Sequence, residues 1–309
     1  MYAVPPELLW ALLGLFVLLG AYRAQRARKR RRRRRFRWSI GYQRSTDPFR
    51  LDPATAAVYS RHDLGPGFGG IADPFVVRHE AGIFLFFEVI IRGTPRGRIG
   101  VSVYDQSRDV WRYEGIVLDE PFHVSYPYVF RHESEFYMIP ETRAACSVRL
   151  YRATEFPRKW KLESVLIDKR KLVDPSIVFR NGRFYLFASY KRRLNLFVSE
   201  ALTGPWSPHP RSPVRRWNCA RCAGRIIEHE GALYRLGQEQ ARGYGAGVHG
   251  FRILELNETD YREEPLAGNP LLVPGGDGWN CAAVHHLDVL NLGGGQYLAV
   301  FDGQGRLDP

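Results

Sequence analysis

The sequence predicts an all-β protein, a five-bladed β-propeller preceded by a single N-terminal transmembrane helix. Three observations predict this fold. A unit of about fifty residues recurs five times along the chain. Within each unit, short segments of alternating apolar and polar residues are bounded by Gly, Pro, Asn and Asp, and near the N-terminus an apolar run is followed by arginines. We divide the chain into an anchor (1–22), an Arg-rich juxtamembrane segment (23–37) and the propeller (38–309).

The anchor is predicted from the run Leu8 to Tyr22, which has fifteen uncharged residues. As a helix it would be about 22 Å long, against a hydrocarbon core of ~30 Å, and flanking Arg side chains can snorkel to reach the interfaces. Glu7 precedes the run and basic residues follow it, the reverse of a cleaved signal peptide. Because Lys/Arg-rich flanks stay in the cytoplasm, we predict a single-pass membrane protein whose propeller faces the cytoplasm. The alternative is a mispredicted start codon that adds a meaningless tail.

The net charge of +13 is concentrated in one segment. Arg23 to Arg37 contains eleven Lys/Arg and no acidic residue, and the remainder is nearly balanced. We expect this segment to lie on an anionic membrane surface. No basic face with interleaved aromatic residues is visible elsewhere in the sequence, so specific nucleic-acid binding is not predicted.

The four cysteines do not indicate a disulfide framework in a cytoplasmic domain. Cys219 and Cys222 form one C-x-x-C, and Cys281 with His285 or His286 could complete a zinc site. Without a second C-x-x-C, we favour small buried hydrophobic residues. The sequence has no glycine-rich nucleotide motif and no Asp-x-Asp metal motif, so it does not support a nucleotide-sugar donor. We predict no metal and no cofactor.

Each repeat opens on an apolar run, and an aromatic-rich run follows after a turn. The five opening runs begin at Asp73, Tyr126, Asp174, Ala223 and Leu287. Counting fifteen residues from each start leads to the polar residues Glu88, Glu141, Ser189, Gln238 and Asp302. Because this offset does not vary, we predict one hairpin geometry in all repeats, with the first strand innermost.

Two further strands complete each of the first four repeats. The third strands are predicted at 99–105, 148–154, 195–201 and 250–256. The fourth strands are marked by Trp111, Trp160, Trp206 and Tyr261. The fifth repeat has only two strands before Pro309, so we expect residues 37–42 to pair with it. Closing the ring in this way removes exposed sheet edges.

Equivalent positions of the innermost strands ring the axis, so acids far apart in sequence are expected to converge at one end of it. Asp73 and Glu88 share one hairpin, Glu141 faces the start of the second, and Asp174 opens the third. Close carboxylates repel, so one usually keeps a proton at neutral pH. A protonated acid beside an ionised one is what cleavage or transfer at a glycosidic bond requires.

The alternative for each Asp-Pro is a turn in which Asp hydrogen-bonds its own backbone. Turn chemistry alone would favour Asp at every blade start, yet Tyr126 and Ala223 replace it. We therefore name Asp73, Asp174, Glu141 and Glu239 as candidate catalytic residues, with Asp302 as a possible further member of the group.

Polar and aromatic residues near the strand starts are candidates to contact a substrate. Tyrosine rings can stack on sugars, whereas a lone His or Arg is more often a structural hydrogen-bonding group. The predicted substrate-binding residues are Glu88, His123, Tyr126, Arg225, Gln238 and His286.

Several motifs together resemble a known family. "ADPF", "HVSYPYVF", "MIPET", "LYRATEFPRKW", "VDPS", "CAGRI" and "LYRLGQEQARGYG" are similar to the N-terminal domain of plant glucosamine inositolphosphorylceramide transferases. The resemblance covers roughly Trp38 to Asp302. That domain is in turn similar in architecture to the five-bladed glycosidases of the arabinanase, invertase and levansucrase group.

The resemblance implies roles for three residues. In the glycosidases an Asp of the first blade is base or nucleophile, an Asp of a middle blade orients, and a later Glu is the acid. Asp73 and Asp174 occupy the first two positions. The acid is either Glu239, in the blade from which the glycosidases supply theirs, or Glu141, which has the stronger local motif. The chain has no clear match to the glycosidases' own acid motif.

Two classes of function follow from the resemblance. The first is a membrane-anchored enzyme that acts on a glycosidic bond, by glycosyl transfer or hydrolysis, with a carbohydrate or glycolipid substrate. The second is a non-catalytic module that binds a glycan or lipid headgroup and assists a separate transferase.

Overall fold

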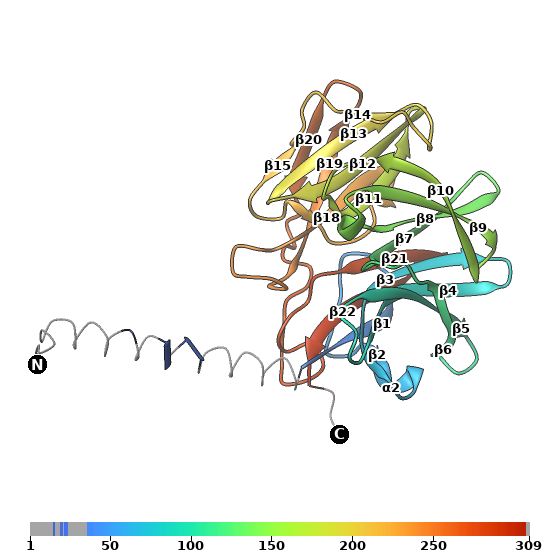
Figure 1. Ribbon diagram of the computed structural model, residues 1–309, viewed down its shortest axis with the longest axis vertical. Helices are drawn as coiled ribbons and strands as arrows, with labels where there is room; N and C mark the ends of the chain where they lie inside the picture. The colour runs from blue at the N-terminus through green and yellow to red at the C-terminus, as the bar shows by residue number, and fades with distance from the viewer. Residues whose placement is uncertain (1–14, 16–18, 21, 24–35, 307–309) are drawn as a thin grey trace, which may run out of the picture.

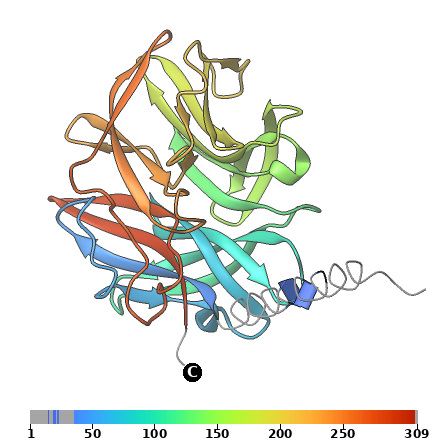
Figure 2. The same ribbon diagram turned by 90° about the vertical axis from the view of Figure 1, so that its left-hand side faces the viewer.

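The computed structural model describes residues 15, 19–20, 22–23 and 36–306. Residues 36–306 form five antiparallel sheets of four or five strands each, which follow one another around the molecule (Figures 1 and 2). The prediction of an all-β, five-bladed propeller is confirmed. In each blade the first strand of the repeat is hydrogen-bonded to the second and the second to the third, as the repeat pattern indicates.

The first three blades are continuous in sequence. Blade one consists of β3 (Phe68–His79), β4 (Gly82–Ile91), β5 (Gly97–Asp105) and β6 (Val110–Leu118). Blade two consists of β7 (Ser125–His132), β8 (Glu135–Glu141), β9 (Val148–Glu155) and β10 (Lys159–Ile167), with the short 3-10 helix η1 (Arg143–Ala145) between β8 and β9. Blade three consists of β11 (Val173–Arg180), β12 (Arg183–Tyr190), β13 (Arg193–Ser199), β14 (Ser207–Pro208) and β15 (Arg215–Arg216).

Blade four has a divided first strand, and blade five joins the two ends of the chain. Blade four consists of β16 (Arg221–Cys222), β17 (Ile227–His229), β18 (Ala232–Gln238), β19 (Val248–Leu256) and β20 (Tyr261–Pro265). Blade five consists of β21 (Leu287–Gly293), β22 (Gln296–Gly305), β1 (Arg37–Ser45) and β2 (Ala57–Tyr59), and helix α2 (Arg61–Leu64) follows β2.

Strand β1 closes the ring, as predicted from the incomplete fifth repeat. It pairs with β22 along its whole length, from Arg37↔Gly305 to Ser45↔Tyr297. In Figure 1 the red strand β22 accordingly lies beside the blue strand β1. The close approach depends on glycine, because a Cβ on Gly41 would lie 2.5 Å from the ring of Trp279.

The first three blades open on a left-handed residue that precedes proline. The φ angles of Asp73, Tyr126 and Asp174 are 52°, 48° and 50°, and in each blade the ladder skips two residues of the first strand there. Proline cannot donate a ladder hydrogen bond, and a bulge re-aims the side chain it carries. The repeated Asp-Pro is therefore a bulge. The residues just before the bulges pair with the ends of the second strands, as Ala72↔Glu88, Ser125↔Glu141 and Val173↔Ser189.

Apolar side chains fill the space between neighbouring blades. Ile40 of blade five packs with Leu85 of blade one in one core cluster, and Phe86 packs with Met138 of blade two in another. All four side chains are fully buried. Burying each such side chain contributes roughly 1.5–3 kcal/mol relative to leaving it exposed, and this burial holds the five sheets in place around the axis.

The predicted anchor (1–22) and Arg-rich segment (23–37) fall almost entirely outside the described residues. Within the described part of the chain, no helix combines the length and the apolar character that a bilayer crossing needs.

Candidate active site

Side chains from all five blades meet at the end of the propeller where the first strands begin, which we call the acid face. Five carboxyl groups lie there with three other polar side chains, and all except Glu88 and Arg221 are buried. This acid cluster consists of Asp73, Glu88, Glu141, Asp174, Asp302, Arg221, Gln238 and His285.

Asp174 is held as a carboxylate by Arg221. The Asp174 side chain is 1% exposed. The Arg221 Nε lies 2.5 Å from Oδ2 and its Nη2 lies 3.1 Å from Oδ1, while the Gln238 amide donates to Oδ2 at 2.9 Å. Burial by itself raises the pKa of Asp174, but the charge and hydrogen bonds of Arg221 outweigh burial, so the pKa lies below its usual value.

The neutral form of Glu141 is favoured beside that carboxylate. Burial, and then the negative charge of Asp174, raises the pKa of Glu141 well above its usual value. Arg221 opposes this shift, but its Nη2 is 3.7 Å from Oε2. Oε2 has no hydrogen-bond partner among the described residues. A proton donor therefore adjoins an ionised acid whose charge keeps the proton in place.

A second group of acids surrounds His285. Asp302 is fully buried and accepts hydrogen bonds from the backbone N–H groups of His285 and His286, each at 3.0 Å. The Nδ1 of His285 lies 2.6 Å from Asp302 Oδ2. Burial opposes both charges, yet this pairing raises the pKa of His285 and lowers the pKa of Asp302. The two residues therefore form an ion pair at neutral pH.

Asp73 and Glu88 lie next to this ion pair. The positive charge of His285 lowers the pKa of both carboxyl groups, and the negative charge of Asp302 raises it. Burial raises the pKa of Asp73 to about 7, although His285 lies only 3.9 Å away. Burial and the charge of Asp73 raise the pKa of Glu88 to about 8. The Asp73 carboxylate also accepts the Tyr126 N–H at 3.2 Å. At neutral pH Asp73 thus exists in both protonation states, which suits a group that takes up and releases a proton.

The cluster is open to solvent at one side. The Glu88 carboxylate faces His123, whose Nε2 is 3.7 Å from Oε1 and whose side chain is 39% exposed. The His123 Nδ1 accepts the Gly97 N–H at 2.8 Å, so Nε2 carries the proton. Burial lowers the pKa of His123 and so favours the neutral ring.

Aromatic rings cover His285. Trp38 stacks on His285 with centroids 4.4 Å apart, and Tyr244 meets the same ring edge-on at 4.9 Å. The guanidinium of Arg221 lies 5.6 Å from the Tyr244 ring. Tyr244 is 56% exposed, so it presents an aromatic face of the kind on which sugar rings stack, directly beside the acids.

The sequence of this chain is similar to that of known proteins over most of its length. Residues 54–304 match the family described as "Glucosamine inositolphosphorylceramide transferase 1, N-terminal". The chain belongs to this family. It is 40% identical over 296 residues to glucosamine inositolphosphorylceramide transferase 1 of Oryza sativa subsp. japonica and 32% identical over 298 residues to that of Arabidopsis thaliana. The matches cover 86% of this chain but only 40% and 39% of those proteins. The resemblance inferred from the motifs is confirmed.

Solved structures share the propeller fold at low sequence identity. An exo-β-1,3-galactanase from Clostridium thermocellum aligns with a TM-score of 0.55 at 14% identity, covering 73% of this chain and 59% of the other. A family 117 glycoside hydrolase of Zobellia galactanivorans aligns with 0.52 at 11%, covering 86% and 90%. The α-L-arabinanase of Cellvibrio cellulosa aligns with 0.50 at 17%, covering 65% and 79%. At these identities the likeness establishes the fold alone.

Glu239 of this family member points away from the acid cluster. It forms a two-point ion pair with Arg242, at 2.7 and 2.8 Å, and its Oε2 lies 3.2 Å from His249. The Arg242 hydrogen bonds lower the pKa of Glu239 to about 2. Gln238, the last residue of β18, donates to Asp174, whereas the ion pairs and hydrogen bonds of the Glu239 side chain among the described residues go to Arg242 and His249. The structure therefore places Gln238, and not Glu239, in the cluster.

Three predicted substrate-binding residues contact other parts of the protein. The Tyr126 hydroxyl is fully buried and bonds to Ser176 and to the Gly224 backbone, each at 2.9 Å. Arg225 forms a two-point ion pair with Asp288, at 2.9 and 3.1 Å. His286 is fully buried as well, and burial lowers its pKa to about 4. These residues tie the inner strands together, and burial leaves Tyr126 and His286 no free surface for a substrate.

Arg221, Trp38 and Tyr244 are site residues that sequence reasoning missed. The first three repeats open on a residue followed by proline, whereas the fourth does not, and Arg221 lies at the start of that fourth repeat. Tyr244 lies in the "GYG" that follows Glu239. Trp38 is the second residue of β1, the strand that closes the ring. In the sequence, the position of these residues beside or within the family motifs was the only indication that they belong to the site.

The structure also shows where the cysteines lie and which residues could together ligate a metal ion. Cys219 and Cys222 are buried and free, and burial raises the pKa of their thiols to about 11 and about 12. Among the described residues, the one group with metal-ligand geometry is Asp73, His285 and Asp302, whose ligand atoms lie within 4.8 Å of one another. Cysteine has no part in that group.

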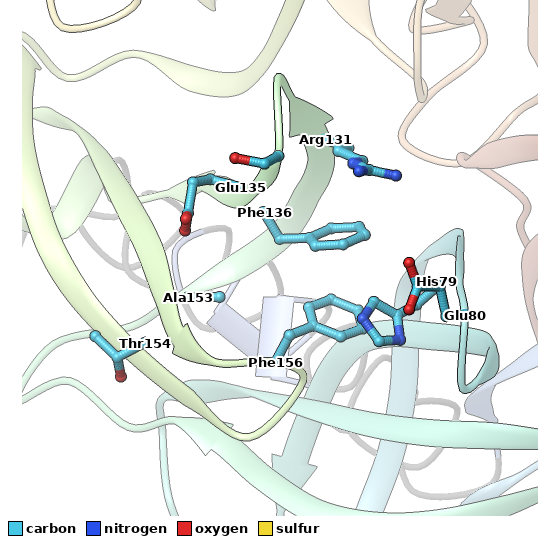
Figure 3. A pocket seen from close by; sticks show the side chains of 9 residues that line it. His79, Glu80, Arg131, Glu135, Phe136, Ala153, Thr154 and Phe156 are labelled. Atoms are coloured by element: carbon cyan, nitrogen blue, oxygen red, sulfur yellow. The ribbon is translucent and has the colours of Figure 1, made fainter.

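A separate pocket lies at the opposite end of blades one and two (Figure 3). It has a volume of about 230 Å³ and is lined partly by His79, Phe136 and Phe156. Phe136 and Phe156 stack at 4.1 Å, and His79 stacks on Phe156 at 4.9 Å. Packed rings floor this pocket, and the acid cluster lies at the other end of the strands.

Proposed function

We propose that this chain acts on a glycosidic bond of a glycolipid headgroup, as a glycosyltransferase or a glycoside hydrolase-like enzyme. The observation that carries the proposal is the pairing of a neutral Glu141 with an ionised Asp174 in a cluster that also contains Asp73. Two acids in opposite protonation states are the requirement for both reactions. The named activity of the relatives, transfer of glucosamine to inositolphosphorylceramide, belongs to the same chemical class.

Each acid has a role that follows from its environment. Glu141 gives its proton to the glycosidic oxygen as the bond to the anomeric carbon breaks. Asp73, when ionised, takes the proton of the attacking hydroxyl or attacks the anomeric carbon itself. Asp174 stays ionised against Arg221 and keeps the Glu141 proton in place until the leaving oxygen accepts it. Because Asp73 has a pKa of about 7, the rate is expected to rise with pH as Asp73 loses its proton and to fall when Glu141 does.

The test compares isosteric variants that remove one proton-transfer group each. In the full-length protein in detergent micelles, D73N and E141Q are expected to lower kcat by about 10²–10⁴-fold, the usual contribution of a positioned acid or base. E239Q is the matched control. Glu239 directly follows β18, and its carboxylate pairs with Arg242 and not with a residue of the acid cluster. Sugar transfer to or release from a glycosyl inositolphosphoryl lipid is followed by mass spectrometry. Equal rates for E141Q and E239Q would refute the assignment.

A second candidate function is a non-catalytic module that binds a glycan or lipid headgroup. It is favoured by one observation, that the matched region is about 40% of the length of the curated relatives. In that case the purified chain binds the headgroup but shows no turnover, and D73N and E141Q change affinity alone. Turnover that depends on Glu141 excludes it.

We also propose that an N-terminal anchor holds the propeller at the cytoplasmic face of a membrane. The support is the apolar run 8–22 followed by the basic run 23–37. A reporter fused after Pro309 that fluoresces only in the cytoplasm is expected to give signal. Signal from an exported reporter at the same position would reverse the topology.

A further inference from the structure

A basic pocket opens on blade three. Its volume is about 480 Å³. It is lined by Tyr190, Lys191, Arg192, Arg193, Arg216 and Trp217. One wall is the turn between β12 and β13, and the other is the end of β15. Strands β13 and β15 pair at Arg193↔Arg216, which brings two basic segments that are separate in sequence against one another.

The positive charges that line the basic pocket have no ion-pair partner in the described part of the chain. Lys191, Arg192, Arg193 and Arg216 supply four positive charges, and no acidic residue lines the pocket. Over the described residues, none of these four side chains makes an ion pair, and strand pairing holds Arg193 and Arg216 opposite one another. Like charges held together repel. An anion bound there would remove that repulsion.

Aromatic side chains flank the charges. Trp217 is 70% exposed and Tyr190 is 40% exposed, which is unusual for such large rings in a protein that buries most of its aromatics. The Lys191 ammonium lies 5.2 Å from the Tyr190 ring. A planar or chair-shaped ring can lie against Trp217 while an attached anionic group meets the cations.

The backbone of the pocket adopts conformations that other residues would adopt more easily. Lys191 and Arg192 form a two-residue hairpin turn with φ of 47° and 58°, where Asn-Gly is normally preferred. Trp217 also has a positive φ, 67°, and its N–H donates to the Arg192 carbonyl at 2.8 Å. Strained residues of this kind gather at ligand sites, where the side chain matters more than the turn.

The basic pocket lies at the same end of the propeller as the acid cluster. Ser189, just before Tyr190, donates to the Ala220 carbonyl at 2.6 Å, and the next residue is Arg221. Trp217 is four residues before Arg221, so their Cα atoms are at most about 14 Å apart. A headgroup made of linked rings can reach from the pocket to Glu141 and Asp174.

We propose that the basic pocket binds a phosphoryl group of the substrate, a phosphodiester attached to a polyol ring, while the adjacent sugar lies at the acid cluster. This inference rests on the proposed function and adds the part of the substrate that is recognised. Arginine forks match the oxygens of a phosphate in two-point contacts, and three arginines favour phosphate over a single carboxylate. The exposed Trp217 ring packs against the polyol.

Binding to soluble probes tests the proposal. The full-length protein in neutral detergent is titrated by calorimetry with glycerophosphoinositol, inorganic phosphate, myo-inositol and a short oligothymidylate. The variant K191N/R192G removes two cations and installs the turn sequence that the backbone prefers, so it is expected to fold at least as stably. R180Q is the control, an exposed arginine at the opposite end of blade three with no ion pair among the described residues.

The expected result is that glycerophosphoinositol binds more tightly than inorganic phosphate or myo-inositol. K191N/R192G weakens that binding by at least about tenfold, and R180Q leaves it unchanged. Three outcomes overturn the proposal: unchanged binding by K191N/R192G, equal affinity for inorganic phosphate, which would indicate a general anion site, or tighter binding of the oligothymidylate, which would indicate a single-stranded nucleic acid.

Failure of the proposed function gives a different result. If E141Q keeps its activity while K191N/R192G loses headgroup binding, the catalytic assignment fails and the phosphoryl pocket stands. If E141Q loses activity while K191N/R192G binds normally, the reverse holds.

Discussion

The contact between Arg221 and Asp174 gives the sharpest prediction about how the site is built. Replacing Arg221 by Met removes the charge and leaves Asp174 at 1% exposure with the Gln238 amide and the Glu141 carboxyl as neutral side-chain partners. Breaking a buried ion pair by removing one partner costs about 3–5 kcal/mol, because the remaining charge has neither solvent nor partner. We therefore expect R221M to lose about 3–5 kcal/mol of unfolding free energy at pH 8.

The same reasoning fixes the effect of pH and of a second substitution. Without Arg221, burial raises the pKa of Asp174 above its value in the unfolded chain. Stability is then lost as pH rises through the new folded pKa, so R221M is expected to lie closer to the wild type at pH 5 than at pH 8. R221M/D174N removes the unpaired charge at this position and is expected to recover most of the loss, since an amide oxygen there can still accept from Gln238.

Urea unfolding followed by tryptophan fluorescence measures these differences. R158M is the matched control, because Arg158 pairs with Glu114 at 2.8 Å on the surface and such pairs contribute about 1 kcal/mol or less. The reasoning is refuted if R221M is no less stable than R158M, or if R221M/D174N is as unstable as R221M alone.

Two further predictions concern Glu88 and the closing strand. Burial raises the pKa of Glu88 to about 8, so its stabilising effect is complete below its unfolded pKa and is lost as pH rises through 8. E88Q is therefore expected to exceed the wild type by about 4–5 kcal/mol near pH 9 and to lie within about 1 kcal/mol of it near pH 5, as measured by urea midpoints. A methyl group on Gly41 would meet Trp279 at 2.5 Å, so G41A is expected to lower stability by about 1–3 kcal/mol, whereas G268A, with open space around its Cα, is not.

The fold was largely predictable because each repeat has the same spacing between its first and second strands. The constant offset between strand starts and second-strand ends reflects one hairpin, and the structure shows it as Ala72↔Glu88, Ser125↔Glu141 and Val173↔Ser189. The incomplete fifth repeat indicated closure by the N-terminal strand for the same reason, since an open ring would leave two unpaired edges.

The site was harder to predict where one blade departs from the repeat. In blade four the pairing is Arg221↔Gln238 and Cys222↔Gly237, one residue out of step with the other hairpins. A one-residue slip exchanges the faces of a strand. Arg221 therefore reaches Asp174, and Ala223, which the repeat marked as the strand start, lies beyond the end of β16. The motif alone does not encode that slip.

The basic pocket was missed for a different reason. Its two segments, "YKRR" and "RRW", are separated by 21 residues, and neither is a long basic run. Only the pairing of β13 with β15 joins them. The large charge of residues 23–37 dominates the sequence, whereas the four unpaired cations of the pocket become visible as a group only in three dimensions.

The central claim is that Glu141 keeps its proton at neutral pH beside an ionised Asp174. Carbon-13 NMR of the chain labelled at its Asp and Glu carboxyl carbons measures this directly. The account predicts one carboxyl signal that is still protonated at pH 7 and is absent from the spectrum of E141Q. If the signal lost in E141Q instead belongs to a carboxyl that has released its proton below about pH 5, the proposed acid is an ordinary carboxylate and the catalytic account is contradicted.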